Sequence, residues 1–203
     1  MRAIFLLALA CLGLGGCVST STIAPAAASD SQIKSGTSIE GPTSVFIPPG
    51  LATYSQEVSV SGFFCGAWSV PVSLGPGLVQ ALDAANHKAF HNLVPAGSGA
   101  QPVPGAKYNV AISLDGFRPH LKLEPGFFSS SGVASAEIDL RIQIADDGGK
   151  QLLTSVVTGD GESESGVFLC SDVKKAMSQA TSLAIQRVAQ NYLDKITGSG
   201  ALQ

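Results

Sequence analysis

The sequence predicts an α+β fold, a two-layer sandwich in which two helices pack on one face of an antiparallel sheet. Several segments alternate apolar and polar residues with a period of two, which is typical of strands with one buried face. Two longer segments carry apolar residues at three- and four-residue spacings, which is typical of helices with one buried face. The predicted order of elements is β-β-α-β-β-β-α. Strands with one polar face suit an antiparallel sheet whose other face is covered by helices.

Two strands are expected before the first helix. Residues 43–47 form a short apolar run, and Pro48-Pro49-Gly50 stops it, as at the edge of a sheet. Residues 55–64 alternate between apolar and polar side chains. Cys65-Gly66-Ala67-Trp68 is expected to end this second strand. The Trp ring near a loop could be a binding platform or could close one edge of the core.

The first helix is expected to open at Gly75-Pro76-Gly77 and to continue to Leu93. Pro95 and the Gly- and Pro-rich residues 96–105 then form a loop. The apolar stripe of this helix consists of Leu78, Leu82, Ala85, Ala89 and Leu93. This face is expected to cover the sheet.

Three strands are expected in the second half of the chain. Residues 108–114 alternate, residues 118–126 are less regular and read as a bend followed by a loop, and residues 133–145 give the clearest alternation. Asp146-Asp147-Gly148-Gly149 has the composition of a tight turn. Residues 150–161 are therefore expected to return as the second arm of a hairpin.

A last helix is expected from a cap at Ser171-Asp172 to Ile196, with Gly198 stopping it. It is long enough to cross the whole sheet. Its apolar stripe consists of Val173, Met177, Ala180, Ala184, Val188, Tyr192 and Ile196.

The N-terminal segment predicts where the protein resides. Met1-Arg2 is a basic start, an apolar run too short to span a bilayer follows, and Leu14-Gly15-Gly16-Cys17 comes next. This order resembles a bacterial lipobox, in which Cys17 becomes the lipid-modified first residue of the mature chain. Residues 1–16 are then the signal peptide.

The rest of the chain divides into three parts. Residues 17–40 are expected to be the lipidated Cys17 and a flexible tether, because Ser, Thr and Ala dominate without a period. Such a coil reaches roughly 25–30 Å. Residues 41–197 form the α+β lipoprotein domain, and residues 198–203 a loose tail.

The charge pattern restricts the partners. The net charge is −3 and only 13% of the residues are charged, so the clustered basic residues that bind nucleic acid or anionic lipid are missing. The lipid on Cys17 is expected to hold the protein to the membrane. Val18 follows Cys17 where an Asp would retain enterobacterial lipoproteins in the inner membrane. We therefore expect an outer-membrane location, with the domain facing the periplasm.

No motif for catalysis or for a cofactor is visible. His87 and His91 have a spacing that can hold zinc, but they lie on the side of the predicted helix opposite its apolar stripe. The acidic residues 159–166 lack the ladder of a calcium loop and read as a loop or strand end kept soluble by charge. There is no G-x-S-x-G, P-loop or G-x-G-x-x-G sequence. We expect no metal, no cofactor and no enzymatic activity.

Three aromatic residues give a candidate contact loop. Phe117, Phe127 and Phe128 cluster with Pro119 and Pro125 in the middle of the chain. If they are exposed, they form a surface for a partner or for lipid. If they are buried, they close one end of the sandwich, and the sequence does not separate these alternatives.

The layout resembles the YajG-type family of small Gram-negative lipoproteins. The features shared with that family are the lipobox, the polar tether, Leu78-Val79-Gln80-Ala81-Leu82 in a helix, Tyr108-Asn109-Val110-Ala111-Ile112-Ser113-Leu114 in a strand, the hairpin and the last Ala-rich helix. The resemblance implies an α+β domain exposed to the periplasm, without catalytic residues. More distantly, the layout is similar to accessory lipoproteins of lipid-transport and lipopolysaccharide-insertion machines, which act as partners.

These observations favour a non-enzymatic outer-membrane lipoprotein that acts as a binding or assembly module, with an envelope protein as its partner. One alternative is an auxiliary subunit of a lipid or glycolipid transport complex, binding lipid in an apolar groove between helices and sheet. The other alternative is a hydrolase whose catalytic residues are scattered along the chain.

The two cysteines outside the N-terminal segment are expected to form a disulfide in an oxidising compartment. Cys65 and Cys170 each precede a predicted helix, after Gly62-Phe63-Phe64 and Gly166-Val167-Phe168-Leu169. A bridge closing so long a loop adds up to ~4–5 kcal/mol to the stability in the chain-entropy model.

Mass spectrometry of non-reduced peptides should show Cys65 joined to Cys170. Free thiols at both positions would contradict the bridge and favour two separately buried cysteines.

Overall fold

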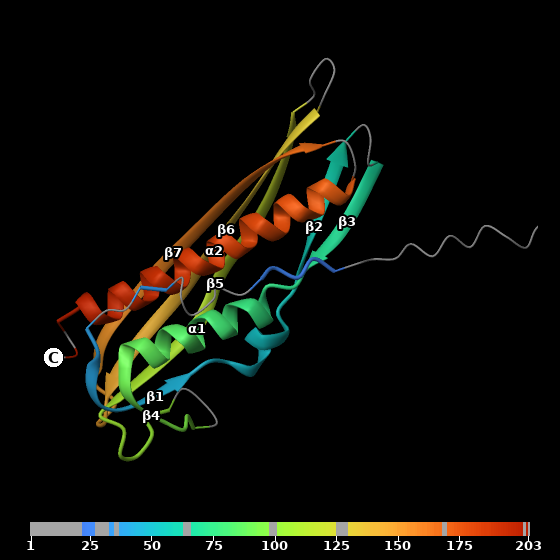
Figure 1. Ribbon diagram of the computed structural model, residues 1–203. Helices are drawn as coiled ribbons and strands as arrows, with labels where there is room; N and C mark the ends of the chain where they lie inside the picture. Colours follow the sequence, from blue (N-terminus) through green and yellow to red (C-terminus); the bar gives the residue numbers. More distant parts are fainter. Residues whose placement is uncertain are drawn as a thin grey trace, which may run out of the picture.

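The computed structural model describes residues 22–26, 33–34, 37–62, 66–97, 101–124, 130–167, 170–200 and 202. The elements in chain order are β1 (Ile39–Phe46), the 3-10 helix η2 (Pro49–Thr53), β2 (Gln56–Gly62), β3 (Gly66–Val72), α1 (Gly75–Ala89), β4 (Phe90–Val94), β5 (Tyr108–Glu124), β6 (Ser130–Asp146), β7 (Gln151–Val167) and α2 (Cys170–Gly198). Strands β5, β6 and β7 each have 17 residues and form the long axis of the molecule (Figure 1).

The α+β class is confirmed, while the direction of some strands differs from the expectation. The main sheet has the order β4-β1-β5-β6-β7, and β2 and β3 form a separate two-stranded sheet. The β5-β6-β7 part is an antiparallel meander, but β1 is parallel to both β4 and β5. The return from β1 to a parallel β4 is made possible by α1, which supplies the crossover that parallel neighbours need.

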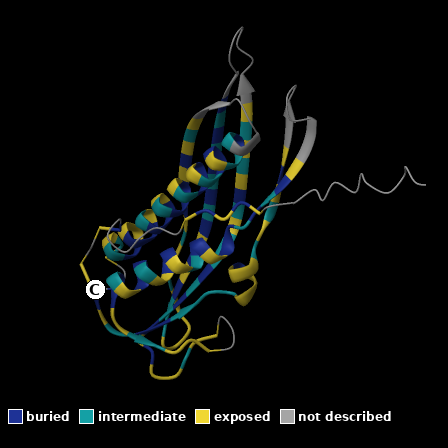
Figure 2. Cartoon of the chain, turned by 45° about the vertical axis from the view of Figure 1, so that its right-hand side comes forward, coloured by how far each residue is buried: buried dark blue, intermediate teal, exposed yellow. Residues whose placement is uncertain are grey.

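Both helices lie on the same face of the main sheet, as expected (Figure 1). Figure 2 shows that buried residues gather where helices and sheet face each other, and that the outward sides of the helices are exposed. The centre of the core is one face of β6, with Ala134, Ala136, Ile138, Leu140, Ile142 and Ile144 buried. The strong alternation of this segment therefore arises, as predicted, because one face of the strand is buried.

The first helix is shorter than predicted, and a strand follows it. Helix α1 ends at Ala89, and Phe90 is already extended with φ −118° and ψ 125°. Residues 90–94 then pair with β1 as β4. Phe90 is buried and Leu93 packs against the core from the strand. Leu93 continues the three- and four-residue spacing of α1 although it belongs to β4. The spacing extends past the helix because both elements pack apolar residues against the same core.

The second strand is one arm of a hairpin that the sequence analysis missed. The sequence analysis expected the second strand to end at residues 65–68. Instead, residues 66–72 form a further strand, β3, which pairs with β2 from Gly62↔Gly66 to Gln56↔Val72. The alternation in β3 is weak, because Pro71 lies among its apolar residues. The hairpin projects from the base of α1 beside the main sheet (Figure 1).

Residues 118–124, expected as a bend and loop, continue β5. Between Leu114 and Gly116 the register with β6 shifts by one residue. A bulge of this kind exchanges the two faces of the strand. Consequently Tyr108, Val110 and Ile112 face the helices before the bulge, and Phe117 faces them after it. The period-two pattern is broken at the bulge although the strand is continuous.

The described part of the predicted tether is docked on the domain. We call residues 22–26 and 33–34 the strap. Ile23 forms a β-bridge with Val72, with Ile23 N donating to Pro71 O at 2.9 Å and Ser73 N donating to Ile23 O at 2.8 Å. Ile33 is only 2% exposed. The apolar side chains of this segment therefore belong to the core, which corrects the expectation of a flexible chain throughout residues 17–40.

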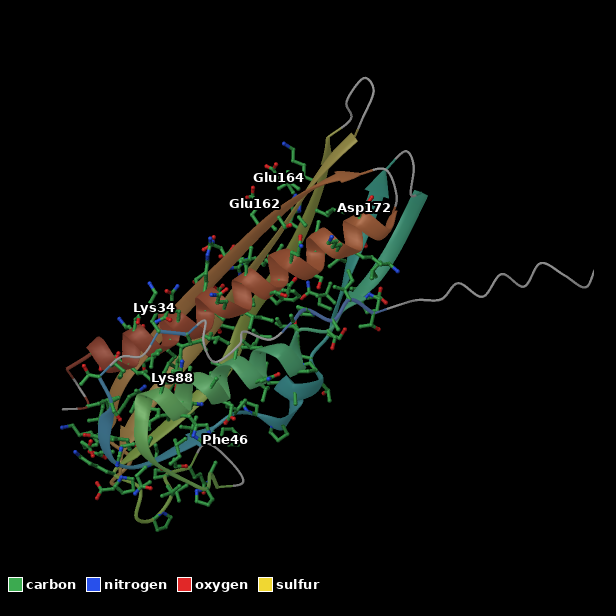
Figure 3. All side chains as sticks on the ribbon, viewed as in Figure 1. Lys34, Phe46, Lys88, Glu162, Glu164 and Asp172 are labelled. Atoms are coloured by element: carbon green, nitrogen blue, oxygen red, sulfur yellow. The ribbon has the colours of Figure 1, made fainter. Side chains whose placement is uncertain are left out.

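The strap is held by both helices. Ser178 of α2 donates to the carbonyl of Ala24 at 3.4 Å, and the backbone N–H of Lys34 donates to Gln190 Oε1 at 2.7 Å. From α1, Lys88 Nζ donates to the carbonyl of Ile33 at 2.5 Å. Figure 3 labels Lys34, which is part of the strap, and Lys88, which is on α1.

Helix α2 lies unusually close to β7, because glycines face it. A Cβ at Gly159 or Gly161 would collide with the backbone of α2 at Ala184 and Ala180. Residues 159–166, expected to be an acidic loop or strand end, are in strand β7, whose acidic side chains Asp160, Glu162 and Glu164 are exposed. The glycines are needed for this close approach, and the acidic residues keep the open side in water.

Gly161→Ala should destabilise the domain by about 3 kcal/mol, because the added methyl group forces the helix and the strand apart. Gly198→Ala is the matched control, since a Cβ at Gly198 meets nothing within 4 Å. Urea unfolding followed by circular dichroism measures both variants. Equal midpoints for Gly161→Ala and the native chain would contradict the close packing.

Candidate functional site

Most of the candidate site residues from the sequence analysis lie outside the part of the chain that the structure describes. Cys17, Cys65, Phe127 and Phe128 lie outside the described residues. Cys170 is the first residue of α2, and its side chain is not described. The lipidation, the disulfide and the contact role of Phe127 and Phe128 therefore remain predictions.

Phe117 does not lie in a loop. It is inside strand β5, only 5% exposed, and its ring meets Tyr54 edge to face with centroids 6.4 Å apart. For this residue the structure supports the alternative in which the ring closes the core. Phe117 is therefore removed from the candidate contact surface.

The two histidines do not share a helix face. His87 is near the end of α1, 3.8 Å from Asp83 Oδ1 and well exposed, whereas His91 lies in β4 beyond the end of the helix. Among the described residues no group of three His, Cys, Asp or Glu side chains could hold a metal ion. Residues four apart are neighbours on a surface only within one helix, so the spacing of His87 and His91 does not bring their imidazoles together.

The face of the sheet that the helices leave open carries a charge network. Arg118 donates to Glu137 Oε1 at 2.6 Å and to Asp139 Oδ2 at 2.5 Å. One step along the sheet, Arg141 donates to Asp115 Oδ1 at 2.8 Å and to Asp115 Oδ2 at 3.0 Å. Both arginines are bound to carboxylates, but the charges of this face are only partly matched, because Glu162 and Glu164 of β7 are exposed on it as well.

These contacts shift the pKa values of their members. The pKa of Asp139 is lowered, first because the Thr158 hydroxyl donates to its carboxylate at 2.6 Å, and further because of Arg118. The pKa of Arg118 is raised by its hydrogen bonds to Glu137 and Asp139. Both shifts favour the charged forms, as expected where each charge has a partner.

Below this network the open face changes to uncharged residues. Strand register puts Ser44, Asn109, Ala145 and Gln151 in one row across β1, β5, β6 and β7. The next row contains Phe46, Ala111, Gln143 and Thr154. Their neighbours Val110, Ile112 and Ile144 are buried on the helix side, so both rows point away from the helices.

These rows form a cleft of about 190 Å³, which we call the neutral cleft. Small side chains at Ser44, Ala111 and Ala145 make its floor, while larger ones rise at its margin. The margin contains Phe46, Gln101, Pro102, Gln143 and Gln151, and no charged residue lines the cleft. Phe46 lies at the end of the sheet away from the tip of the β5-β6 hairpin (Figure 3).

Asn109 fixes the loop that overhangs the neutral cleft. Its Oδ1 accepts from the backbone N–H of Val103 at 2.7 Å, and its Nδ2 donates to the carbonyl of Asp146 at 3.3 Å. Gly149, in the turn between β6 and β7, has φ +81°, and a Cβ there would lie 3.5 Å from Pro102. The loop and the turn are therefore held together, and the margin of the cleft is preorganised.

Sequence reasoning missed the neutral cleft because its residues come from four strands and one loop. Each of them alone is an ordinary polar or small residue on the exposed side of a strand. Only the register between strands brings the carboxamides and Phe46 together, and register is not visible in the local pattern. The one available signal was the alternation itself, which placed Asn109 and Gln143 on the polar faces of their strands.

No protein-family model matches the chain, and no curated protein matches its sequence. The chain is similar in shape to a minor lipoprotein from Acinetobacter baumannii (TM-score 0.43, 12% identity, covering 81% of this chain and 96% of that chain). It is also similar to a DUF330 protein from Xanthomonas campestris (TM-score 0.44, 14% identity, covering 89% and 97%). A protein described as a lipoprotein from Caulobacter crescentus gives a TM-score of 0.37 at 13% identity, covering 62% and 82%. At such TM-scores the similarity assigns neither family nor function.

Neither helix of the described chain has an apolar stretch of the length that a bilayer crossing requires.

Asp139 should make the stability depend on acid. Because its folded pKa lies below the unfolded value of roughly 3.9, the stabilisation is present above that value and is lost as the pH falls through the folded pKa. Asp139→Asn should reduce the loss of stability that the native chain shows as the pH falls below the unfolded pKa, by on the order of 1 kcal/mol.

Urea unfolding across that pH range measures the difference. Asp147→Asn, at an exposed position in the turn, is the control and should follow the native chain. The interpretation fails if Asp139→Asn and Asp147→Asn have the same pH profile.

Proposed function

We propose that this protein is a non-enzymatic lipoprotein of the cell envelope, anchored to the outer membrane through lipid on Cys17 and facing the periplasm, where it acts as a binding or assembly module. The observation that carries the proposal is the docked strap directly after the lipobox. A segment that served only as a spacer would not need isoleucines buried in the domain, whereas Ile23 and Ile33 are buried there.

The strap limits the distance between the domain and the proposed lipid. Ile23 is six positions after Cys17, so the two residues are at most about 20 Å apart by covalent geometry. The β-bridge to Val72 makes this a fixed point on the domain. The domain is thus held against the membrane surface, where a freely coiled tether would have allowed a larger separation.

The open face of the sheet is the surface that such an anchored domain offers to a partner. It extends over three strands of 17 residues. Paired charges occupy one part of it and the neutral cleft another. Because Arg118 and Arg141 are each bound to carboxylates, this part of the face favours a specific polar interface over nonspecific binding of anions.

The alternative of a lipid-transport subunit required an apolar groove between helices and sheet. In the described part of the chain this space is filled by the core, to which Ile23 and Ile33 of the strap belong. One cleft, the neutral cleft, lies on the open face, and another lies at the end of α2 beside Ile39, Lys107 and Ile196. We therefore favour binding or assembly over lipid transport.

The proposed disulfide is compatible with the topology. The adjoining ends of β2 and β3, which pair at Gly62↔Gly66, and the first turn of α2 lie at the same end of the molecule (Figure 1). The tip of the β5-β6 hairpin is at that end as well, since Glu124 pairs with Ser131. A bridge between Cys65 and Cys170 would tie the hairpin to α2.

Cross-linking in cells followed by pull-down tests the proposal. The native protein should fractionate with the outer membrane and capture a defined envelope complex, whereas Cys17→Ser should lose both. Val18→Asp is the matched control, because it retains the lipidated cysteine and changes only the sorting position. The control should remain membrane-bound and lose the outer-membrane partner. Capture of the same complex by Cys17→Ser, or no capture by the native protein, would contradict the proposal.

A further inference from the structure

We propose that the neutral cleft binds a neutral saccharide. The inference deepens the proposed function, since it names a ligand class for a module proposed to bind. It depends on the chemistry of the cleft, on its place in the sheet and on its preorganisation.

The side chains of the neutral cleft match the two kinds of surface that a sugar ring presents. Phe46 supplies an aromatic ring, and it is not among the partly buried residues that pack against the core. The C–H face of a pyranose can stack on such a ring. Gln101, Gln143 and Gln151 supply carboxamides, each with two donors and an acceptor. Hydroxyl groups both donate and accept, so neighbouring carboxamides satisfy them without a charge.

The absence of charge among the lining residues excludes other ligand classes. A phosphate or carboxylate would leave its own charge unmatched in the cleft, and a metal ion would find no carboxylate or imidazole ligand among these residues. On the same face of the sheet, Arg141 and Asp115 are bound to each other. An extended peptide would be expected at a free sheet edge, whereas this cleft is on the face of the sheet.

The size and rigidity of the cleft also fit one ring of an oligosaccharide. A volume of 190 Å³ corresponds to roughly six waters at about 30 Å³ each. The floor is made of strands, and Asn109 accepts one hydrogen bond from Val103 of the overhanging loop and donates another to Asp146 at the end of β6. Among the described residues, the side chains of Gln101 and Gln143 have no hydrogen-bond partner and remain available to a ligand. Asn109 is in this arrangement a positioning residue.

The test uses the full lipidated protein in a zwitterionic detergent without a sugar headgroup. Titration calorimetry with the tetramers of N-acetylglucosamine and of glucose should show binding of at least one of them. The dissociation constant should not change with salt, because no charge is involved. Phe46→Leu should weaken binding about tenfold, since the aromatic face is lost. Phe46→Tyr retains that face and should remain within about twofold.

Gln143→Ala should also weaken binding, whereas the control Gln179→Ala, on the exposed side of α2, should not. Circular dichroism of each variant verifies the fold. No binding of either tetramer, equal binding by Phe46→Leu, or tighter binding of an anionic oligosaccharide would overturn the inference. If the anchored protein still captures its envelope complex while both tetramers fail, only the saccharide inference is lost. If the tetramers bind and no complex is captured, the assembly role is lost and the saccharide site stands.

Discussion

The contact between α2 and β7 is the constraint on which the rest of the structure depends. Gly159 and Gly161 allow the helix backbone to lie against the strand, facing Ala180 and Ala184. At this separation α2 also protects the free edge of the sheet. Asn191 Nδ2 donates to the carbonyl of Thr158 at 2.7 Å, and Arg187 donates to the carbonyl of Asp160 at 3.0 Å. The carbonyls of an edge strand, which otherwise invite pairing with another chain, are thereby occupied.

The position of α2 in turn determines where α1 and the strap lie. Tyr192 is fully buried and its hydroxyl donates to Asn86 Oδ1 of α1 at 2.5 Å. Burial raises the pKa of Tyr192, so the phenol stays protonated and remains a donor. Neither polar group has access to water, and each therefore depends on the other. The same helix pair then holds the strap through Ser178, Gln190 and Lys88.

The sequence predicted the elements whose signal is local and repeated. Residues 133–145, the turn at Asp146-Asp147-Gly148-Gly149 and the last helix were predicted because burial on one face gives a regular period. The strand at residues 90–94 was missed because it continues the buried side of α1, and the second half of β5 because a bulge reverses its faces. The neutral cleft could not be predicted, since it depends on the register of β1, β5, β6 and β7. Likewise, nothing local marks Ile23 and Ile33 as core residues within a polar segment.

The parallel placement of β1 determines the order in which the chain can fold. Strands β5, β6 and β7 and helix α2 contact their neighbours in sequence and can assemble first, whereas β1 must wait for both β4 and β5. A chain exported with its N-terminus first, as the predicted signal peptide implies, thus presents β1 long before its partners arrive. The strap waits longest, because Ser178 and Gln190, which hold it, are on the last element to emerge. Its docking therefore completes folding, and in a chain whose synthesis stops before α2 the strap would lack its partners on that helix.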